Sequence, residues 1–391
     1  MIQQIWNTGG NQPPELAHDA PHVLLVVDQF GRTLGGGERV ILRLARLLPQ
    51  YGFRVSILTF LIDPKSPVLE EVPVCPLYVL PLRRTYDFKA LRAASALRQF
   101  LQKENIQIVQ TFFESSDLWA GIIVKAFSNA KLIWSRRDMG ILRSPKHQIA
   151  YRLLSRLPDL VFAVSEQVRQ HCIEIDKIDP TRVITIHNGL TISPQETRHT
   201  TIDGFPHVTT VGNIRRVKGH DVFIRAAAIV LKHCPGASFS VAGNILEREY
   251  FSELELLVEE LGISQQFHFI GPTKGVAAHL HSCDVFVLPS RSEGFSNAII
   301  EAMNESLPII ATDVGGNSEA VVDNVSGFIV PPDDESTLAK AIITLCLNPM
   351  VACNMGRAGR KIVEERFSEA AMMRRIQAAY ITHLHKRSSE L

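Results

Sequence analysis

Apolar, β-branched runs alternate with segments of helical periodicity along almost the whole chain. His22–Phe30, Phe53–Phe60 and Ile106–Thr111 are runs of strand length, and Asp87–Lys103 has apolar side chains at the spacing of one helix face. Such alternation is typical of α/β proteins, in which helices cover the faces of a mostly parallel sheet. The sequence therefore predicts an α/β fold built on parallel sheets.

The chain of 391 residues is longer than one ordinary domain. Thr191–Gly204 is polar, contains a proline and has no periodicity, as expected of a linker. We therefore expect two doubly wound domains, residues 1–200 and 201–370, followed by a C-terminal helical segment, 371–391. In open parallel sheets ligands bind beyond the carboxyl ends of the strands, so the loops at those ends are the candidate sites.

The overall charge is nearly balanced, with 41 Lys and Arg against 40 Asp and Glu and a net charge of +1. This balance argues against a protein that binds nucleic acid in general. Residues 81–160 differ, with 14 Lys and Arg against 6 Asp and Glu, an excess of +8. That region fits contact with an anionic lipid surface or acceptor, and it fits an ordinary solvated surface equally well.

The six cysteines are scattered, without a Cys-x-x-Cys pair or a spacing suited to zinc, so we expect reduced thiols and no metal. Residues 1–20 are polar and show no signal peptide. No apolar run approaches the roughly 18 residues of a membrane-spanning helix. We expect a cytoplasmic protein, with peripheral contact at the inner membrane face as a further option. The sequence gives no signal for the oligomeric state.

A strand, a loop and a helix follow one another from Asp284 to Met303. Glu293 lies in the loop, and Glu301 lies about two turns into the helix. Unpaired backbone N–H groups at a helix start favour a phosphate, and a carboxylate favours hydroxyl groups. The combination fits a nucleotide sugar; the alternatives are a glycosidase acid/base pair and glutamates that merely cap or face solvent. The residues that open the helix are Gly294, Phe295, Ser296 and Asn297.

A second candidate turn, Val211–Gly219, follows a strand and precedes a helix. Its cations, Arg215, Arg216 and Lys218, would balance the charge of a diphosphate, most of all as it leaves. Gly212 and Asn213 begin the same turn. A basic surface turn is the alternative reading.

The third candidate turn is glycine-rich, with Gly35, Gly36 and Gly37 ahead of a helix. The full dinucleotide fingerprint G-x-G-x-x-G is absent and no acidic residue ends the next strand, so a dehydrogenase has little support. Arg137, just after a short strand, either faces the ligand cleft from the acceptor side or forms surface ion pairs.

Taken together, these motifs resemble the family 4 glycosyltransferases, the retaining, nucleotide-sugar-dependent group also called glycosyl transferases group 1. Glu293 and Glu301 match the E-x7-E signature of that family, and Lys218 falls on the lysine of its V-G-x5-K-G turn. Gly35–Arg39 and the Gly315-Gly316 pair also match. The resemblance covers roughly residues 22–380.

The resemblance implies a GT-B fold, in which two Rossmann-like domains face a central cleft and the last helix packs back on the first domain. Lys218 would neutralise the donor diphosphate, Glu293 would hold hydroxyls of the donor sugar, and Glu301 the ribose hydroxyls. The remaining donor-binding positions would be Gly212, Asn213, Arg215, Gly294, Phe295, Ser296 and Asn297, with Gly35, Gly36, Gly37 and Arg137 on the acceptor side.

The implied activity is metal-independent, cofactor-free transfer of a hexosyl group from a UDP- or GDP-sugar to a glycan or lipid-linked acceptor. Envelope polysaccharide, lipopolysaccharide or glycolipid synthesis would be its setting. Two departures stand out: Asn213 replaces an arginine of many relatives, with Arg215 or Arg216 as its substitute, and 111–114 lacks their histidine. A non-catalytic GT-B scaffold that binds a nucleotide sugar, and a GT-B sugar-nucleotide epimerase, stay open as alternatives.

Overall fold

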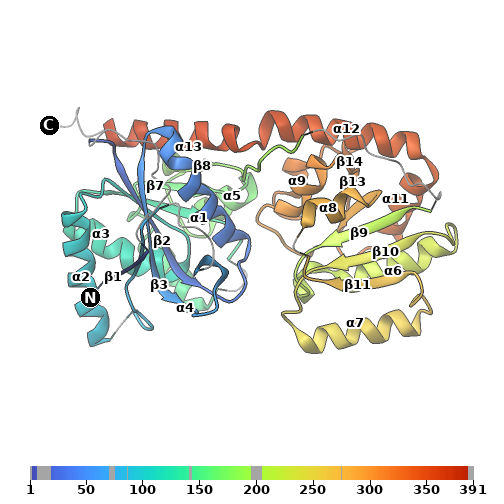
Figure 1. The fold of residues 1–391 in the computed structure, drawn as a ribbon, viewed down its shortest axis with the longest axis horizontal. Helices are drawn as coiled ribbons and strands as arrows, with labels where there is room; N and C mark the ends of the chain where they lie inside the picture. Colours follow the sequence, from blue (N-terminus) through green and yellow to red (C-terminus); the bar gives the residue numbers. More distant parts are fainter. Residues whose placement is uncertain are drawn as a thin grey trace. The chain divides into compact units, whose positions relative to one another are not determined.

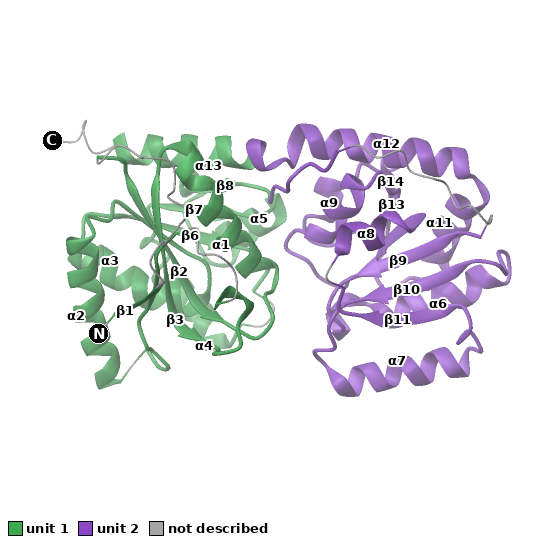
Figure 2. Ribbon diagram, viewed as in Figure 1, with its two compact units in different colours: residues 1–187, 372–391 green, residues 188–371 purple. Residues whose placement is uncertain are grey.

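The computed structural model describes residues 2–6, 19–69, 75–85, 87–140, 143–194, 205–273 and 275–385. The chain forms two compact units, unit 1 from residues 1–187 and 372–391 and unit 2 from residues 188–371 (Figure 2). Each unit is built on a mainly parallel sheet, so the predicted α/β class is confirmed. The boundary lies N-terminal to the predicted one at residue 200, and most of the predicted linker lies outside the described residues.

The sheet of unit 1 contains eight strands in the order β1-β4-β3-β2-β5-β6-β7-β8. Among the described strands of this sheet, only β1 is antiparallel to its neighbour. The chain winds outward in both directions from β2, so the loops that follow β2 and β5 diverge and leave room for a ligand. The strands are β1 (Gln3–Trp6), β2 (His22–Phe30), β3 (Arg54–Ile62), β4 (Leu77–Val79), β5 (Ile108–Thr111), β6 (Lys131–Arg136), β7 (Leu160–Ala163) and β8 (Val183–Thr185).

Helices pack on both faces of this sheet (Figure 1). Asp87 begins one of them, α2, by accepting a hydrogen bond of 2.8 Å from the backbone N–H of Ala90. The last helix, α13, contributes Tyr380, which is fully buried and stacks on Phe162 with ring centroids 5.9 Å apart. The helices are α1 (Gly36–Leu47), α2 (Phe88–Lys103), α3 (Gly121–Phe127), α4 (Pro145–Leu153), α5 (Glu166–Glu174) and α13 (Glu369–His385).

The sheet of unit 2 has six parallel strands in the order β11-β10-β9-β12-β13-β14. Here the winding reverses at β9, which lies between β10 and β12. The strands are β9 (His207–Val211), β10 (Ser238–Ala242), β11 (Phe267–Gly271), β12 (Val285–Leu288), β13 (Ile309–Thr312) and β14 (Gly327–Val330). The helices are α6 (His220–Leu231), α7 (Arg248–Glu260), α8 (Val276–His281), α9 (Asn297–Asn304), α10 (Asn317–Ala320), α11 (Glu335–Leu347) and α12 (Pro349–Arg366).

Within the described part of the chain, no single helix is long and apolar enough to cross a membrane. Only α11 and α12 taken together reach that length and composition, and the chain bends by 103° between them.

Candidate active site

The two predicted donor-side turns meet in unit 2. The turn at 212–219 follows β9 and the loop at 289–296 follows β12, and these strands are parallel neighbours, so both loops leave the same edge of the sheet. The backbone N–H of Arg291 donates to the carbonyl of Val217 at 2.8 Å. The side chain of Arg291 also donates to the carbonyl of Arg216 at 2.7 Å. These two hydrogen bonds therefore hold one predicted segment against the other.

Lys218 and Glu293 form an ion pair at this edge, with Lys218 Nζ 2.5 Å from Glu293 Oε1. The hydroxyl of Ser290 donates to the same carboxylate oxygen at 2.7 Å. The Glu293 side chain is 10% exposed and that of Lys218 is 26% exposed. A carboxylate held by two donors in a mostly buried position has a defined orientation, which suits the recognition of sugar hydroxyls.

The Gly315 turn after β13 packs directly on the backbone of Glu293. Gly315 has φ +55°, and a Cβ at this position would lie 1.9 Å from the carbonyl oxygen of Glu293. The N–H of Gly316 donates to the carbonyl of Gly294 at 2.9 Å. Glycine is thus required here both for its left-handed conformation and for the close approach. The predicted Gly315-Gly316 turn therefore packs against the backbone of the Glu293 loop and supports it.

The two arginines of the β9 turn have different surroundings. The guanidinium of Arg216 pairs with Glu253 and lies over the ring of Tyr250, 4.9 Å from its centroid. Arg215 Nε is buried and has no hydrogen-bond partner among the described residues. Since an unsatisfied buried donor is costly, Arg215 is the arginine available to an anionic ligand.

Three predicted donor-binding side chains have structural contacts. Asn213 Oδ1 accepts hydrogen bonds of 3.3 Å from the N–H and from the side-chain amide of Asn244. Phe295 is buried and its ring lies 5.3 Å from that of Phe367. Asn297 accepts a 2.6 Å hydrogen bond from the side chain of Asn188.

The other donor-side predictions concern backbone and helix positions. A Cβ on Gly212 would lie 3.9 Å from Lys218 Cδ, which places this glycine beside the ion pair. Ser296 is the N-cap of α9, and Gly294 precedes it in the loop. Glu301 lies within α9 and is half-buried.

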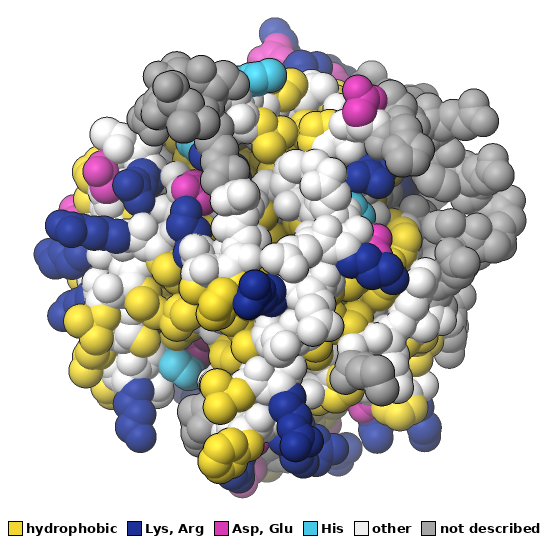
Figure 3. Space-filling view, turned by 90° about the vertical axis from the view of Figure 1, so that its left-hand side faces the viewer, with side chains coloured by type: hydrophobic (Ala, Val, Ile, Leu, Met, Phe, Trp, Pro, Cys, Tyr) yellow, Lys and Arg dark blue, Asp and Glu magenta, His cyan; other side chains and the backbone are white. Residues whose placement is uncertain are grey.

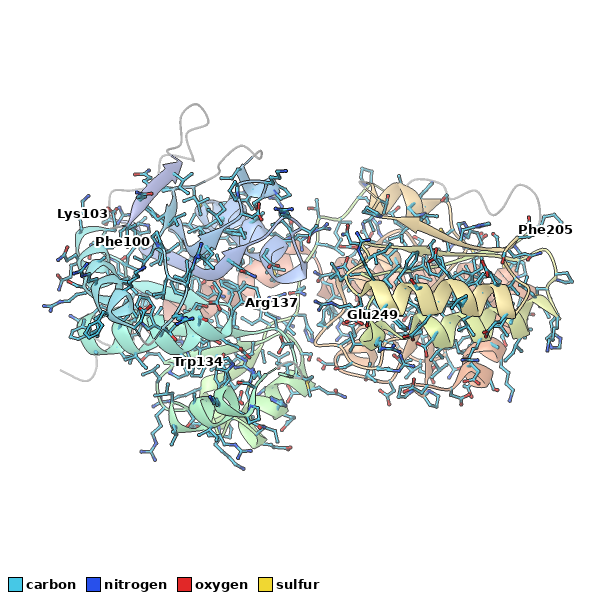
Figure 4. The ribbon with its side chains drawn as sticks, turned by 90° about the horizontal axis from the view of Figure 1, so that it is seen from below. Phe100, Lys103, Trp134, Arg137, Phe205 and Glu249 are labelled. Atoms are coloured by element: carbon cyan, nitrogen blue, oxygen red, sulfur yellow. The ribbon has the colours of Figure 1, made fainter. Side chains whose placement is uncertain are left out.

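Unit 1 contains a cavity of about 450 Å³ at the carboxyl ends of β2, β3, β5 and β6. Arg137 and Phe113 line this cavity, and Gly37 lies beside them: a Cβ on Gly37 would lie 3.0 Å from Phe113 Cζ and 3.9 Å from Arg137 Cδ. Gly35 is the N-cap of α1 and Gly36 its first residue. Arg137 comes directly after β6, the strand that contains Trp134 (Figure 4). Of the predicted acceptor-side residues, Arg137 thus lines the cavity, while Gly35, Gly36 and Gly37 are not part of its lining.

Sequence reasoning missed a buried ionic network beside this cavity. Arg136 Nη2 lies 3.3 Å from Asp176 Oδ2, and Arg136 Nη1 lies 4.0 Å from Asp117 Oδ2. Arg143 donates to both oxygens of Asp176 at 3.1 and 3.2 Å. Tyr151 donates to Asp117 at 2.9 Å, while burial raises the pKa of Asp117 to about 7. The network holds the cavity wall in one arrangement.

Two further acidic residues of the cavity were also missed. Asp28, near the end of β2, accepts hydrogen bonds from the N–H groups of Ser115 and Ser116 at 2.9 and 2.7 Å. Burial raises its pKa, and these hydrogen bonds oppose the rise. Glu114 Oε2 lies 2.8 Å from His147 Nδ1. His147 of α4 therefore lies beside Glu114, a proximity that only the tertiary structure reveals.

Within the described residues, no group of three His, Cys, Asp or Glu side chains has the geometry of a metal site.

Comparison with known families matches nearly the whole chain. Residues 34–193 match "Glycosyltransferase Family 4", and residues 194–362 match "Glycosyl transferases group 1". The two matches are consecutive and together span residues 34–362. The chain therefore belongs to the family 4 glycosyltransferases, which have the GT-B fold, and the predicted family is confirmed.

Similar proteins include the Vi polysaccharide biosynthesis protein VipC/TviE of Salmonella typhi, 30% identical over 210 residues. That match spans 50% of this chain but only 36% of the Salmonella protein. An uncharacterized glycosyltransferase of Haemophilus influenzae is 22% identical and matches over 85% of this chain and 92% of its own length. The structure of Anabaena Alr3699/HepE in complex with UDP and glucose matches with a TM-score of 0.77 at 21% identity. It covers 92% of this chain and 99% of the Anabaena chain.

Proposed function

We propose that this protein transfers a hexosyl group, with retention of anomeric configuration, from a nucleoside-diphosphate sugar to a hydroxyl of a glycan or lipid-linked acceptor. The observation that carries the proposal is the 2.5 Å contact between Lys218 and Glu293 at the carboxyl edge of the unit 2 sheet. The contact places a cation that suits a diphosphate beside a carboxylate that suits sugar hydroxyls. A nucleotide sugar carries both of these groups. No metal or cofactor takes part in the proposed reaction.

Lys218 and Arg215 neutralise the diphosphate, and the backbone N–H groups at the start of α9 add the positive end of a helix. Glu293 accepts hydrogen bonds from the donor sugar, and Glu301 from the ribose. Stabilisation of the leaving diphosphate lowers the barrier, because its negative charge grows as the glycosidic bond breaks. The acceptor oxygen bonds to the anomeric carbon as the diphosphate leaves, and its proton passes to a diphosphate oxygen.

The donor is a UDP- or GDP-sugar. The Anabaena neighbour in complex with UDP and glucose supports UDP as the first nucleotide to test. The acceptor binds in the cavity of unit 1, beside Gly37 and Arg137. The likenesses to a Vi polysaccharide biosynthesis protein and to a lipopolysaccharide core biosynthesis mannosyltransferase support a role in cell-surface polysaccharide or lipopolysaccharide synthesis. We place this role on the cytoplasmic side.

The test is calorimetric titration of the protein with UDP-, GDP- and ADP-sugars, with and without a chelator. We expect Lys218→Ala to weaken binding of the preferred donor by about ten- to a hundredfold, because a charge-assisted contact contributes roughly 1.5–3 kcal/mol. Glu293→Gln keeps nucleotide binding but loses most transfer. The matched control is Lys232→Ala, an exposed lysine of unit 2 outside the site.

Each alternative function predicts a different experimental result. Binding of a nucleotide sugar without transfer to any glycan favours the non-catalytic scaffold. Conversion of the nucleotide sugar in the absence of an acceptor favours the epimerase. Undiminished donor binding and transfer in Lys218→Ala contradict the proposed donor site.

A further inference from the structure

The side chain of Arg291 joins its own loop to three other segments of unit 2. Arg291 lies in the loop after β12, two residues before Glu293. Its Nη1 donates to the carbonyl of Arg216 in the turn after β9 at 2.7 Å, and its Nε donates to Asp333 after β14 at 2.7 Å. Nη1 and Nη2 also donate to the two carboxylate oxygens of Asp221 at 2.9 and 2.7 Å. All three guanidinium nitrogens are therefore engaged within the protein.

The contact between Arg291 and Asp221 is a bidentate ion pair, in which a planar guanidinium faces a carboxylate. Asp221 lies in the first turn of α6 and also accepts a hydrogen bond of 2.6 Å from the hydroxyl of Tyr250. Burial opposes the ionisation of Asp221, but the hydrogen bonds from Arg291 and Tyr250 lower its pKa. Both members of the pair are thus charged at neutral pH, and their relative orientation is fixed.

Arg291 differs from the cations that project into solvent. Lys and Arg side chains of that kind stand out from the surface shown in Figure 3. Ion pairs of such exposed side chains contribute little. The Arg291 side chain is only 32% exposed, and its hydrogen bonds need the forked shape of a guanidinium. A lysine at this position would keep the charge, but its single nitrogen could not reach the same acceptors together.

The ion pair of the proposed donor site lies close to these contacts. Residues 216–218 and 291–293 are two short segments, each at most about 7 Å long between its end Cα atoms. At one end they are joined by the bonds from Arg291 to the carbonyls of Arg216 and Val217. At the other end they are joined by the 2.5 Å contact between Lys218 and Glu293. A change in the Arg291 contacts therefore changes how Glu293 meets Lys218.

We propose that Arg291 and Asp221 are positioning residues, which hold the loop of Glu293 against the turn of Lys218 so that both side chains meet the donor in one arrangement. The inference rests on the proposed function of that ion pair as the donor site. Because the guanidinium of Arg291 is engaged by Asp221, Asp333 and the Arg216 carbonyl, Arg291 acts on the donor through Lys218 and Glu293 rather than by direct contact.

The first test is amide hydrogen exchange of the full chain without any nucleotide. We expect Arg291→Lys to raise the exchange rates of residues 212–219 and 289–296 by about tenfold or more, because the two segments separate more often. Exchange in the strands of unit 1 stays unchanged, which shows that the variant is folded. The matched control is Arg225→Lys, at an exposed arginine of α6, which exchanges as the wild type does. Wild-type exchange of both segments in Arg291→Lys would overturn the proposal.

The second test is calorimetric titration with UDP and GDP, which separates positioning from charge. Arg291→Lys keeps the positive charge, yet we expect it to weaken nucleotide binding by about tenfold, nearly as much as Arg291→Gln does. Asp221→Asn removes a negative charge, which by electrostatics alone would strengthen binding of a diphosphate. Positioning predicts the opposite, a weakening by about fivefold or more. Lys218→Ala then has less than about a threefold effect in the Arg291→Lys background, because Lys218 is no longer held in place.

Three binding results would contradict the positioning role. One is wild-type affinity in Arg291→Lys together with a loss in Arg291→Gln, which would assign to Arg291 a direct charge contact with the diphosphate. Another is tighter nucleotide binding by Asp221→Asn. A third is a full, additive loss from Lys218→Ala in the Arg291→Lys background. Absence of UDP and GDP binding by the wild type would contradict only the proposed function, because hydrogen exchange measures the positioning without a nucleotide.

Discussion

At the scale of single residues, the two adjacent arginines of the turn after β9 have the same type of side chain but different contacts. Arg216 pairs with Glu253 on the surface, whereas Arg215 has a buried Nε without a partner among the described residues. We therefore predict that Arg215→Gln weakens binding of the nucleoside diphosphate by about ten- to a hundredfold. Arg216→Gln removes only an exposed ion pair, which contributes little, and changes binding by less than about twofold. Calorimetric titration with UDP and GDP measures both, and equal losses in the two variants would contradict the assignment.

The sequence predicted the residue types of the proposed donor site but not the contacts that each side chain makes within the protein. Asn213, Phe295 and Asn297 were predicted to bind the donor, and their side chains hold the loops through Asn244, Phe367 and Asn188. Asp117 gave no signal in the sequence. Its partners Arg136 and Tyr151 are distant in the chain, so only folding reveals the buried network.

At the scale of the elements, the turn after β13 supports the loop of Glu293 by direct backbone contact. We predict that Gly315→Ala lowers the free energy of unfolding by well over 2 kcal/mol and abolishes most transfer, since its Cβ would lie 1.9 Å from the Glu293 carbonyl oxygen. The matched control is Gly262→Ala. Gly262 has φ +68° with no atom within 4 Å of the added Cβ, so only the conformational cost of about 1–2 kcal/mol applies.

Denaturant unfolding measures the loss of stability in each glycine variant, and initial rates measure the loss of transfer. If Gly262→Ala cost as much as Gly315→Ala, the left-handed conformation rather than the contact with Glu293 would be responsible.

Strands and helices whose apolar residues recur at a regular spacing were predicted with nearly the observed bounds. The predicted strand His22–Phe30 has the same bounds as β2, and the predicted helix from Asp87 to Lys103 matches α2 with its N-cap. The short strands Gln3–Trp6 and Leu77–Val79 and the helix α4 were missed. The strands are only four and three residues long, and α4 buries a single residue fully, so none has a period that sequence reasoning detects.

At the scale of the whole molecule, the end of the chain completes the core of unit 1. Tyr380 is fully buried between Phe53 and Phe162 and donates a hydrogen bond to Gln110. We predict that Tyr380→Ala lowers the free energy of unfolding of unit 1 by about 3–5 kcal/mol, while unit 2 still binds the nucleotide. Ile381, 42% exposed on the same helix, provides the control Ile381→Ala, for which we expect less than about 1 kcal/mol.

Thermal unfolding followed separately in each unit, with and without UDP, measures this effect. Equal destabilisation by the two substitutions would show that α13 stabilises unit 1 by its helical structure rather than by the buried ring.

The sequence by itself determined the α/β class and the family, and it predicted the positions of the motifs proposed to bind the donor. Strand and helix periods are local, and the glutamate, lysine and glycine spacings lie within single strand–loop–helix units. Only the tertiary structure decided which arginine of the β9 turn has a guanidinium nitrogen without a partner among the described residues, and which side chains line the cavity of unit 1. Those properties depend on contacts between residues that are distant in the chain, and such contacts form only when the sheets bring their loops to one edge.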